Sequence, residues 1–323
     1  MAAPGTAGLC HTNRMSAVPI VAVVGPTASG KTELSLDLAE RLDGEVVNTD
    51  AMQVYRGMDI GTAKLPPGDR RGIPHHLLDT LTVRDPLTVA EFQQQARAVI
   101  AELRRRGATP VLVGGSALYT RAVVDRFEFP GTDPEVRARL EGELTEVGPH
   151  AMHARLRDVD PEAAERILPD NGRRIVRALE VVEITGRPFT ASLPQLEYVD
   201  PLTIQIGVDI DRPTLDARIE QRVVDMFDAG LVEEVERLLG EGLADGRTAS
   251  RAIGYREVAA YLNGELSLEE ARERTFLATR RFARRQDSWF RNDPRIVWVG
   301  YDDPNRLDRA VKAIEVLQIE NWR

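Results

Sequence analysis

Short apolar runs alternate with amphipathic segments of helical period along the first part of the chain. Residues 20–24 and 45–48 form such runs, and residues 110–113 form a third. The segment 88–106 instead carries apolar residues three and four positions apart, which predicts a helix. Strands that alternate with helices are typical of a parallel sheet, whose ligands gather at the carboxyl ends of its strands. We therefore predict an α/β fold with a parallel-sheet core flanked by helices.

The pattern changes after Pro130. From Asp133 to about Leu193 the chain consists of short helical stretches, with prolines near their starts and no convincing strand. Thr203 to Ile210 returns to a strand-like run, which we expect to rejoin the sheet. The remaining pattern predicts helices over 215–239, 256–262 and 268–290, a last strand over 295–299 and a closing helix over 305–317.

These changes divide the chain into three parts. Residues 1–16 are small and polar and predict a flexible tail, in which Met15 is an alternative start. Residues 17–130 and 195–323 together predict one core domain with C-terminal helices. Residues 131–194 predict an all-helical insertion domain.

The loop after the first predicted strand has the sequence GPTASGKT and precedes an amphipathic segment, 33–42. Glycines let such a loop curl so that several N–H groups point at one anion, and the helix adds its positive N-terminal end. Lys31 supplies a mobile cation, and Thr32 supplies a hydroxyl that can hold Mg²⁺. This order is that of a phosphate-binding P-loop; the alternative is a glycine turn with a solvated lysine. The phosphate-binding interpretation includes Gly25, Pro26, Thr27, Ala28, Ser29, Gly30, Lys31 and Thr32.

Asp50 follows the second predicted strand and begins the segment 50–64. A carboxylate at a strand end that faces a P-loop can hold Mg²⁺ or accept a proton from a nucleophile; the alternative is an aspartate that caps the next turn. Gln53 offers the donor and acceptor that pair with an adenine edge. Lys64 either holds a second phosphate or is exposed.

A third strand end carries Ser116, which follows a pair of glycines. Because the carboxyl ends of parallel strands meet at one edge of a sheet, we expect Lys31, Asp50 and Ser116 to converge in one crevice. His75 and His76 are adjacent, and neighbouring residues diverge in a strand. Since no further metal-ligand spacing completes a zinc site, we interpret both histidines as structural.

Three sets of arginines are candidates for phosphate contacts. Arginines four positions apart share a helix face, and the segment 279–291 has two such pairs, with the aromatic residues Phe282, Trp289 and Phe290 interleaved along the segment. Guanidinium groups reach phosphates with paired donors, and a basic helix of this kind suits an RNA backbone. The alternative is a solvated face on a core helix. The candidates are Arg173, Arg174, Arg177, Arg251, Arg256, Arg280, Arg281, Arg284 and Arg285.

Composition narrows the classes of function. The 42% hydrophobic content suits a globular core, and the net charge of −9 argues against a protein that coats nucleic acid nonspecifically. No apolar run approaches the ~20 residues that span a bilayer. We see no secretory signal. The single cysteine, Cys10, excludes an internal disulfide and fits a cytoplasmic location.

Seven segments, taken together and in order, resemble the tRNA dimethylallyltransferases, also called tRNA isopentenyltransferases. They cover most of the chain from Val18 to Pro294. Ala51 stands where many members have Ser, and Ala117 where many have Gly. The segments are GPTASGKT, DAMQVYRGMDIGTAK, PHHLLD, VGGSALY, GRRIVRALEV, RAIGYRE and TRRFARRQDSWFR.

The resemblance implies a P-loop NTPase-like core with a helical insertion that contributes to tRNA binding. It also implies transfer of the dimethylallyl group from dimethylallyl diphosphate to the exocyclic amine of the adenine just 3′ of the anticodon. The tRNAs concerned read codons that start with U, and the P-loop holds the diphosphate ester rather than ATP. We expect Mg²⁺ as the cofactor, the tRNA anticodon stem-loop as the partner, no membrane association, and a monomer.

The resemblance assigns roles to particular residues. The family's catalytic base maps onto Asp50, and its usual threonine after the Gly-Gly pair maps onto Ser116, which keeps the hydroxyl. The tRNA contacts that it implies are Asp50, Ala51, Met52, Gln53, Ser116, Arg139, Arg173, Arg174, Arg177, Arg251, Tyr255, Arg256, Arg280, Arg281, Arg284 and Arg285.

Two other classes of function use the same residues. A small-molecule kinase would place ATP at the P-loop, although an arginine-rich lid is not evident and Asp79, after Leu77-Leu78, is only a weak match to the usual apolar run and aspartate. A non-catalytic RNA-binding protein with an NTPase-like fold would have no use for Asp50.

Overall fold

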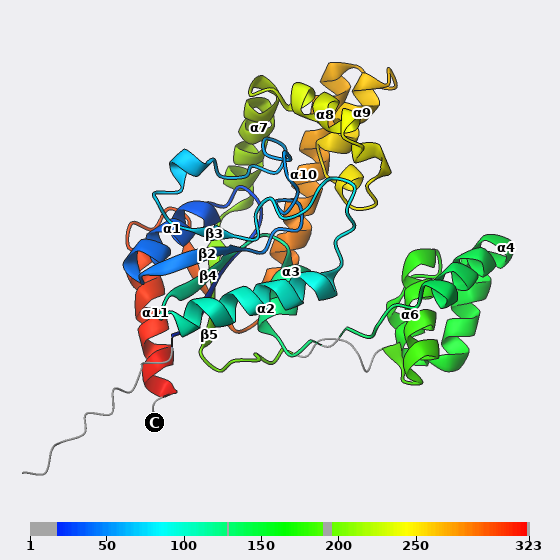
Figure 1. Ribbon diagram of the computed structural model, residues 1–323, viewed down its shortest axis with the longest axis horizontal. Helices are drawn as coiled ribbons and strands as arrows, with labels where there is room; N and C mark the ends of the chain where they lie inside the picture. The colour runs from blue at the N-terminus through cyan, green and yellow to red at the C-terminus, as the bar shows by residue number, and fades with distance from the viewer. Residues whose placement is uncertain (1–17, 128, 190–195, 322–323) are drawn as a thin grey trace, which may run out of the picture.

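A single six-stranded parallel sheet forms the centre of the protein (Figure 1). The computed structural model describes residues 18–127, 129–189 and 196–321, so the predicted tail at 1–16 lies outside the described residues. The strand order is β3-β2-β4-β1-β5-β6. The strands are β1 (Ile20–Val24), β2 (Gly44–Asn48), β3 (His75–His76), β4 (Thr109–Val113), β5 (Thr203–Asp209) and β6 (Ile296–Gly300).

Alternation along β1 shows how helices cover both faces of the sheet. Val21 and Val23 pack toward α1 (Lys31–Arg41) and α11 (Arg306–Glu320). The intervening residues of β1 pack toward α2 (Val89–Arg105) and α3 (Ala117–Val124) on the other face. Because side chains alternate across a strand, a strand buried on both faces is apolar throughout, as its sequence predicts.

The C-terminal helices rise beyond the carboxyl edge of the sheet (Figure 1). The sequence predicts one helix over 215–239, and this is wrong: the chain turns at Gly230, whose φ is 100°, and two helices result. The short helix α3 was also missed. These helices are α7 (Arg212–Asp228), α8 (Leu231–Gly240), α9 (Tyr255–Leu262) and α10 (Leu268–Arg291); short 3₁₀ turns are Pro67–Asp69, Leu243–Asp245 and Ala249–Arg251.

Three helices between β4 and β5 form a separate small body (Figure 1). They are α4 (Pro134–Val159), which kinks at Gly148, α5 (Pro161–Arg166) and α6 (Gly172–Thr185). The helices pack on one another around their own core, and Figure 1 shows them standing apart from the sheet. The buried residues of this helical core are Leu140, Met152, Leu156, Ala163, Ala164, Ile167, Ile175, Val176, Ala178 and Leu179.

The two chain connections to this body pair with each other where they leave the core. The amide of Arg126 donates to the carbonyl of Glu197 at 2.8 Å, and the amide of Val199 donates to the carbonyl of Val124 at 2.9 Å. The fully buried Asp125 between them accepts from Arg295 at 2.8 Å. The helical body therefore starts from a fixed point on the core.

The α/β prediction is confirmed, with all strand pairs parallel. The two-residue strand β3 was not predicted as part of the sheet, because a strand so short has no period to detect. Among the described residues, no helix has the length and apolar character needed to cross a membrane.

The contact between β5 and β6 generates a stability prediction. A Cβ added at Gly207 would lie 2.6 Å from the Trp298 ring and 2.7 Å from a methyl of Ile296. We expect Gly207→Ala to lower the free energy of unfolding by about 1–3 kcal/mol through overpacking. Gly240→Ala, at the open end of α8 with nothing within 4 Å, is the matched control and should leave stability unchanged or raised. Urea unfolding of both variants measures this difference. Equal stabilities would show that β6 moves to make room for the methyl group at no cost in free energy.

Candidate functional site

The loop after β1 has the backbone geometry of an anion cradle. Gly25 and Gly30 have φ of 139° and 98°, and Ala28 between them also has a positive φ of 65°. Left-handed conformations are costly for residues with a Cβ, so the surrounding structure holds Ala28 in place. The helix α1 begins at Lys31, and its positive N-terminal end opens onto the loop. The loop therefore has the backbone geometry of loops that bind phosphate groups.

Lys31 lies at the mouth of this loop with an unusual charge balance. Its Nζ donates to the carbonyl of Pro26 at 2.6 Å. The pKa of Lys31 is lowered from 10.5 to about 7: burial lowers it most, the Arg222 guanidinium also lowers it, and the Asp50 carboxylate opposes both. An incoming anion would favour the charged ammonium and so draw a proton onto Lys31.

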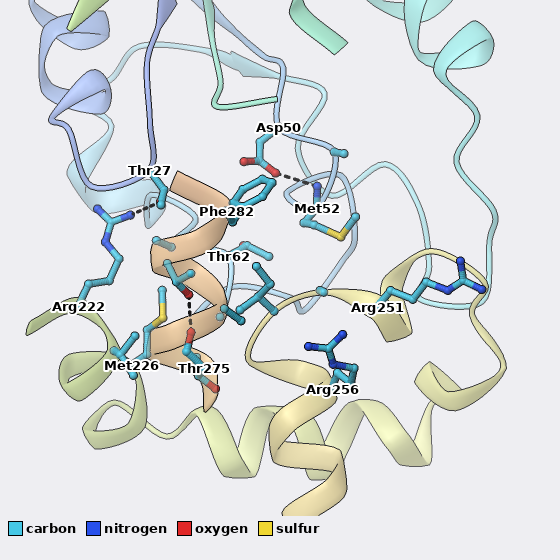
Figure 2. A pocket seen from close by; sticks show the side chains of 18 of the residues that line it. Thr27, Asp50, Met52, Thr62, Arg222, Met226, Arg251, Arg256, Thr275 and Phe282 are labelled. Carbon is cyan, nitrogen blue, oxygen red and sulfur yellow. Dashed lines mark hydrogen bonds between the residues drawn. The ribbon is translucent and has the colours of Figure 1, made fainter. Parts of the chain in front are cut away.

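Arg222, on α7, is a site residue that sequence reasoning missed. Its Nη1 donates to Oγ1 of Thr27 at 3.1 Å. Both residues line a cavity at the carboxyl edge of the sheet (Figure 2). The sequence pattern could have indicated this residue: α7 buries Ile219 and Val223, and Arg222 lies on the same apolar face of the helix. A charged residue on an apolar helix face requires a buried partner or a bound anion.

Gln286, on α10, is the second residue that was missed. Its Oε1 accepts from the Thr27 amide at 2.9 Å, and its Nε2 donates to the carbonyl of Gly115 at 2.7 Å. The side chain thus joins the P-loop to the turn after β4.

Asp50 lies at the carboxyl end of β2 and faces the cavity. Its Oδ1 accepts from the Met52 amide at 2.8 Å, while its own amide donates to Oδ1 of Asn48 at 2.8 Å. Burial raises the pKa of Asp50, whereas the Met52 amide and Lys31 lower it. A carboxylate with a raised pKa in a partly dry site is a suitable proton acceptor.

A cavity of about 540 Å³ gathers the predicted groups at this edge of the sheet. Asp50, Ala51, Met52 and Ser116 line it together with Thr27 of the P-loop. Ser116 begins α3 without a capping hydrogen bond from its side chain, so its hydroxyl is available to a ligand. The structure therefore brings the P-loop, Asp50 and Ser116 together, as the parallel sheet requires.

The helix α10 forms one wall of this cavity (Figure 2). Arg281, Phe282 and Arg285 line it, and Arg251 and Arg256 approach from the opposite wall. Arg280 and Arg284 instead point to α7, where their guanidinium groups lie 3.9 and 3.0 Å from a carboxylate oxygen of Asp216. The two predicted arginine pairs of this helix therefore have different surroundings.

Three predicted residues of the 50–64 segment and of α9 have internal partners. Gln53 donates to the carbonyl of Thr62 at 3.1 Å. Tyr255 is 1% exposed, and its hydroxyl donates to Glu234 at 2.5 Å, which favours a supporting position over direct contact with RNA. The exposed alternative for Lys64 is wrong: it is buried and donates to Asp59 and Asp79 at 2.6 Å each, and to the carbonyl of Tyr55.

The predicted arginines of the insertion also differ in their surroundings. Arg139 pairs with Glu183, and Arg177 donates to the carbonyls of Pro130 and Gly131. Arg173 and Arg174, at the start of α6, are exposed, and no hydrogen bond or ion pair engages their side chains within the described parts of the chain. Of the four, Arg173 and Arg174 are therefore the freest to meet a phosphate.

Metal-binding groups are sparse in the part of the chain that the structure describes. No cluster of three or more His, Cys, Asp or Glu there could hold a metal ion. His75 and His76 have structural partners, the carbonyl of Ile73 and the carboxylate of Glu45. Thr32 is exposed at the start of α1. This donor set fits Mg²⁺ only as an ion that substrate phosphates help to hold, which is its usual mode at phosphate sites.

Comparison with known proteins identifies the family of the chain. A family model described as IPP transferase matches residues 53–293. A curated tRNA dimethylallyltransferase from a Nocardioides species is 79% identical over 296 residues, which cover 92% of this chain and 96% of that protein. The chain belongs to the tRNA dimethylallyltransferase family.

Other members agree in sequence and in fold. The tRNA dimethylallyltransferase of Salinispora arenicola is 58% identical, over 91% of this chain and 86% of that protein. The solved tRNA isopentenylpyrophosphate transferase of Bacillus halodurans is 39% identical, with a TM-score of 0.69 over 94% of this chain and 97% of that one. A eukaryotic dimethylallyltransferase solved acting on tRNA is 26% identical, with a TM-score of 0.78 over 93% and 78%. The fold is thus the P-loop NTPase-like fold of the tRNA dimethylallyltransferases.

The charge state of Lys31 generates a pH prediction. Lys31 attracts a diphosphate by its charge only in the ammonium form. Affinity for a diphosphate ester should therefore be highest below the Lys31 pKa of about 7 and fall as the pH rises through it. The fall should be at most about tenfold per pH unit, and binding should take up a proton. Isothermal titration in buffers of different ionisation enthalpy measures both. Lys31→Met should bind more weakly and lose this pH dependence; an unchanged dependence would assign it to another group.

Proposed function

We propose that the protein transfers the dimethylallyl group from dimethylallyl diphosphate to the exocyclic amine of the adenine just 3′ of the anticodon, releasing diphosphate. The proposed tRNAs read codons that start with U. One observation carries the proposal: Thr27 of the P-loop and the Asp50 carboxylate line one cavity whose walls include five arginines and Phe282. A diphosphate site, a base and an RNA-compatible wall meet there.

In the proposed reaction, the adenine nitrogen attacks the first carbon of the dimethylallyl group. The new carbon–nitrogen bond forms as the carbon–oxygen bond to diphosphate breaks, and its electron pair stays on the diphosphate oxygen. The nitrogen loses a proton, which Asp50 accepts. The raised pKa of Asp50 helps the carboxylate to take that proton, and Ser116 offers a hydroxyl that orients the amine.

The P-loop stabilises the charge that develops on the leaving diphosphate. Its backbone amides and Lys31 face the phosphates, and Arg222 adds a second cation beside Thr27. Fixed donors aimed at developing charge are worth more in a site that excludes water than in solution. Mg²⁺, held by Thr32 and the phosphates, would supply further charge stabilisation there.

The cavity must also receive a base that has left its stack. Unstacking costs a few kcal/mol, and flipped bases are held by aromatic stacking and by contacts to their edges. Phe282 offers a ring at the wall, and Arg251, Arg256, Arg281 and Arg285 surround the opening. Arg173 and Arg174 of the insertion would extend the contact to the anticodon stem-loop. We further propose that the protein works as a monomer in the cytoplasm, where its tRNA substrates are.

One assay separates this function from its alternatives. With labelled dimethylallyl diphosphate, ATP and bulk tRNA, we expect label to appear in tRNA. Consumption of ATP with a small acceptor would support a kinase, and binding without reaction would support a non-catalytic RNA-binding protein. Asp50→Asn should lower turnover by ~10²-fold or more, the usual scale for a general base, with tRNA affinity within about tenfold of wild type. Turnover near wild type would make Asp50 a structural cap.

The two arginine pairs of α10 give a test of the RNA surface. Changing both Arg281 and Arg285 to Gln should weaken tRNA binding and flatten the log–log salt dependence by about one to two units, since two phosphate contacts are lost. Binding of dimethylallyl diphosphate and the melting temperature should change little, because exposed arginines contribute little to folding.

The matched variant changes Arg280 and Arg284 to Gln on the same helix. These two already pair with Asp216, so we expect the smaller effect on tRNA binding. Filter binding at several salt concentrations compares the two variants. A larger effect from the Arg280 and Arg284 pair would place the RNA on the Asp216 side of α10.

A further inference from the structure

Gln286 is a buried polar side chain whose position on α10 needs an explanation. It is 5% exposed and follows directly after Arg285, which lines the cavity. Its amide makes one bond to each of two segments that carry proposed substrate contacts, at 2.9 Å to the Thr27 amide and 2.7 Å to the Gly115 carbonyl. An apolar residue would fill the same space, so the amide is present for its two polar contacts.

We propose that Gln286 is a positioning residue that fixes the P-loop relative to Ser116 and ties both to α10. The proposal rests on the proposed function, because the two segments matter only if one holds diphosphate and the other faces the acceptor. Gln286 itself does not line the cavity. It acts through Thr27 and Gly115.

The sheet itself does not fix this spacing. Parallel pairing of β1 with β4 ends with Val23 opposite Val113, and the P-loop and the Gly115 turn continue beyond that point. The Gln286 amide supplies, across these two loops, the donor and acceptor that a strand ladder would have supplied. Thr27 is also held on its other side, where Arg222 donates to its hydroxyl at 3.1 Å.

The side-chain amide of Gln286 packs closely against the turn at Gly115. A Cβ added at Gly115 would lie 2.3 Å from Nε2 of Gln286, which no side chain could tolerate without displacing the amide. The glycine before Ser116 is therefore required by the contact with Gln286. A shift of about 1 Å between reacting groups can lower a rate by about 10²-fold, so a contact that fixes this spacing acts directly on the reaction.

Gln286→Leu removes both hydrogen bonds with little change in size. We expect its kcat/KM for dimethylallyl diphosphate to fall by about tenfold or more, and its affinity for a non-hydrolysable diphosphate analogue to fall with it, while tRNA affinity stays within about threefold. The matched control is Gln93→Leu, because Gln93 on α2 also donates to two carbonyls, those of Ala122 and Phe127, outside the cavity lining. Both variants lose stability, but only Gln286→Leu should lose diphosphate affinity.

Gln286→Glu adds a readout that a packing role would not move. Its carboxylate still accepts from Thr27 but repels the Gly115 carbonyl, whereas the protonated carboxyl donates to that carbonyl. The deficit relative to wild type should therefore shrink as the pH falls, and that of Gln286→Leu should stay constant. Diphosphate affinity is measured by calorimetry, so this test holds even if wild-type protein transfers no dimethylallyl group, an outcome that would overturn only the proposed function. Wild-type affinity in folded Gln286→Leu, or a pH-independent deficit in Gln286→Glu, would overturn the positioning role.

Discussion

Parallel pairing of β1 between β4 and β5 is the constraint on which the site depends. Because all strands run the same way, the loops that follow β1, β2 and β4 leave the sheet at one edge. The P-loop, Asp50 and Ser116 are separated by tens of residues in the sequence, yet this geometry alone gathers them. The helices after β5 then close the same edge, and α10 brings its cations and Gln286 to it.

Five arginines and one carboxylate, that of Asp50, line the cavity, and Lys31 interacts with both Arg222 and Asp50, so the local charge favours an anionic ligand. Arg222 and the burial of Lys31 both disfavour the ammonium form, and only Asp50 opposes them. In the free protein this excess of positive charge is costly, and a bound diphosphate relieves it. The same closeness keeps Asp50 useful as a base, because Lys31 lowers a pKa that burial has raised. Binding and proton transfer are therefore coupled through one small group of charges.

Local patterns predict the strands, the P-loop and the site residues that follow strand ends, because each depends on neighbours in the sequence. Arg222 and Gln286 could not be found in this way, since they reach Thr27 across 195 and 259 positions. Lys64 was misjudged for the same reason: its pairing with Asp79 exists only after the 50–64 segment folds back. The resemblance implied a tRNA contact for Tyr255, but this side chain is buried and its hydroxyl donates to Glu234.

The insertion has its own core and joins the sheet domain where its two connections pair beside Asp125. Cooperative unfolding follows contiguous packing, so a body with a separate core is a separate unit of stability. Substitutions inside that core are then screened from the chemistry at the P-loop. The length, charge and curvature of the helical body can therefore change in evolution while the carboxyl edge of the sheet stays as it is.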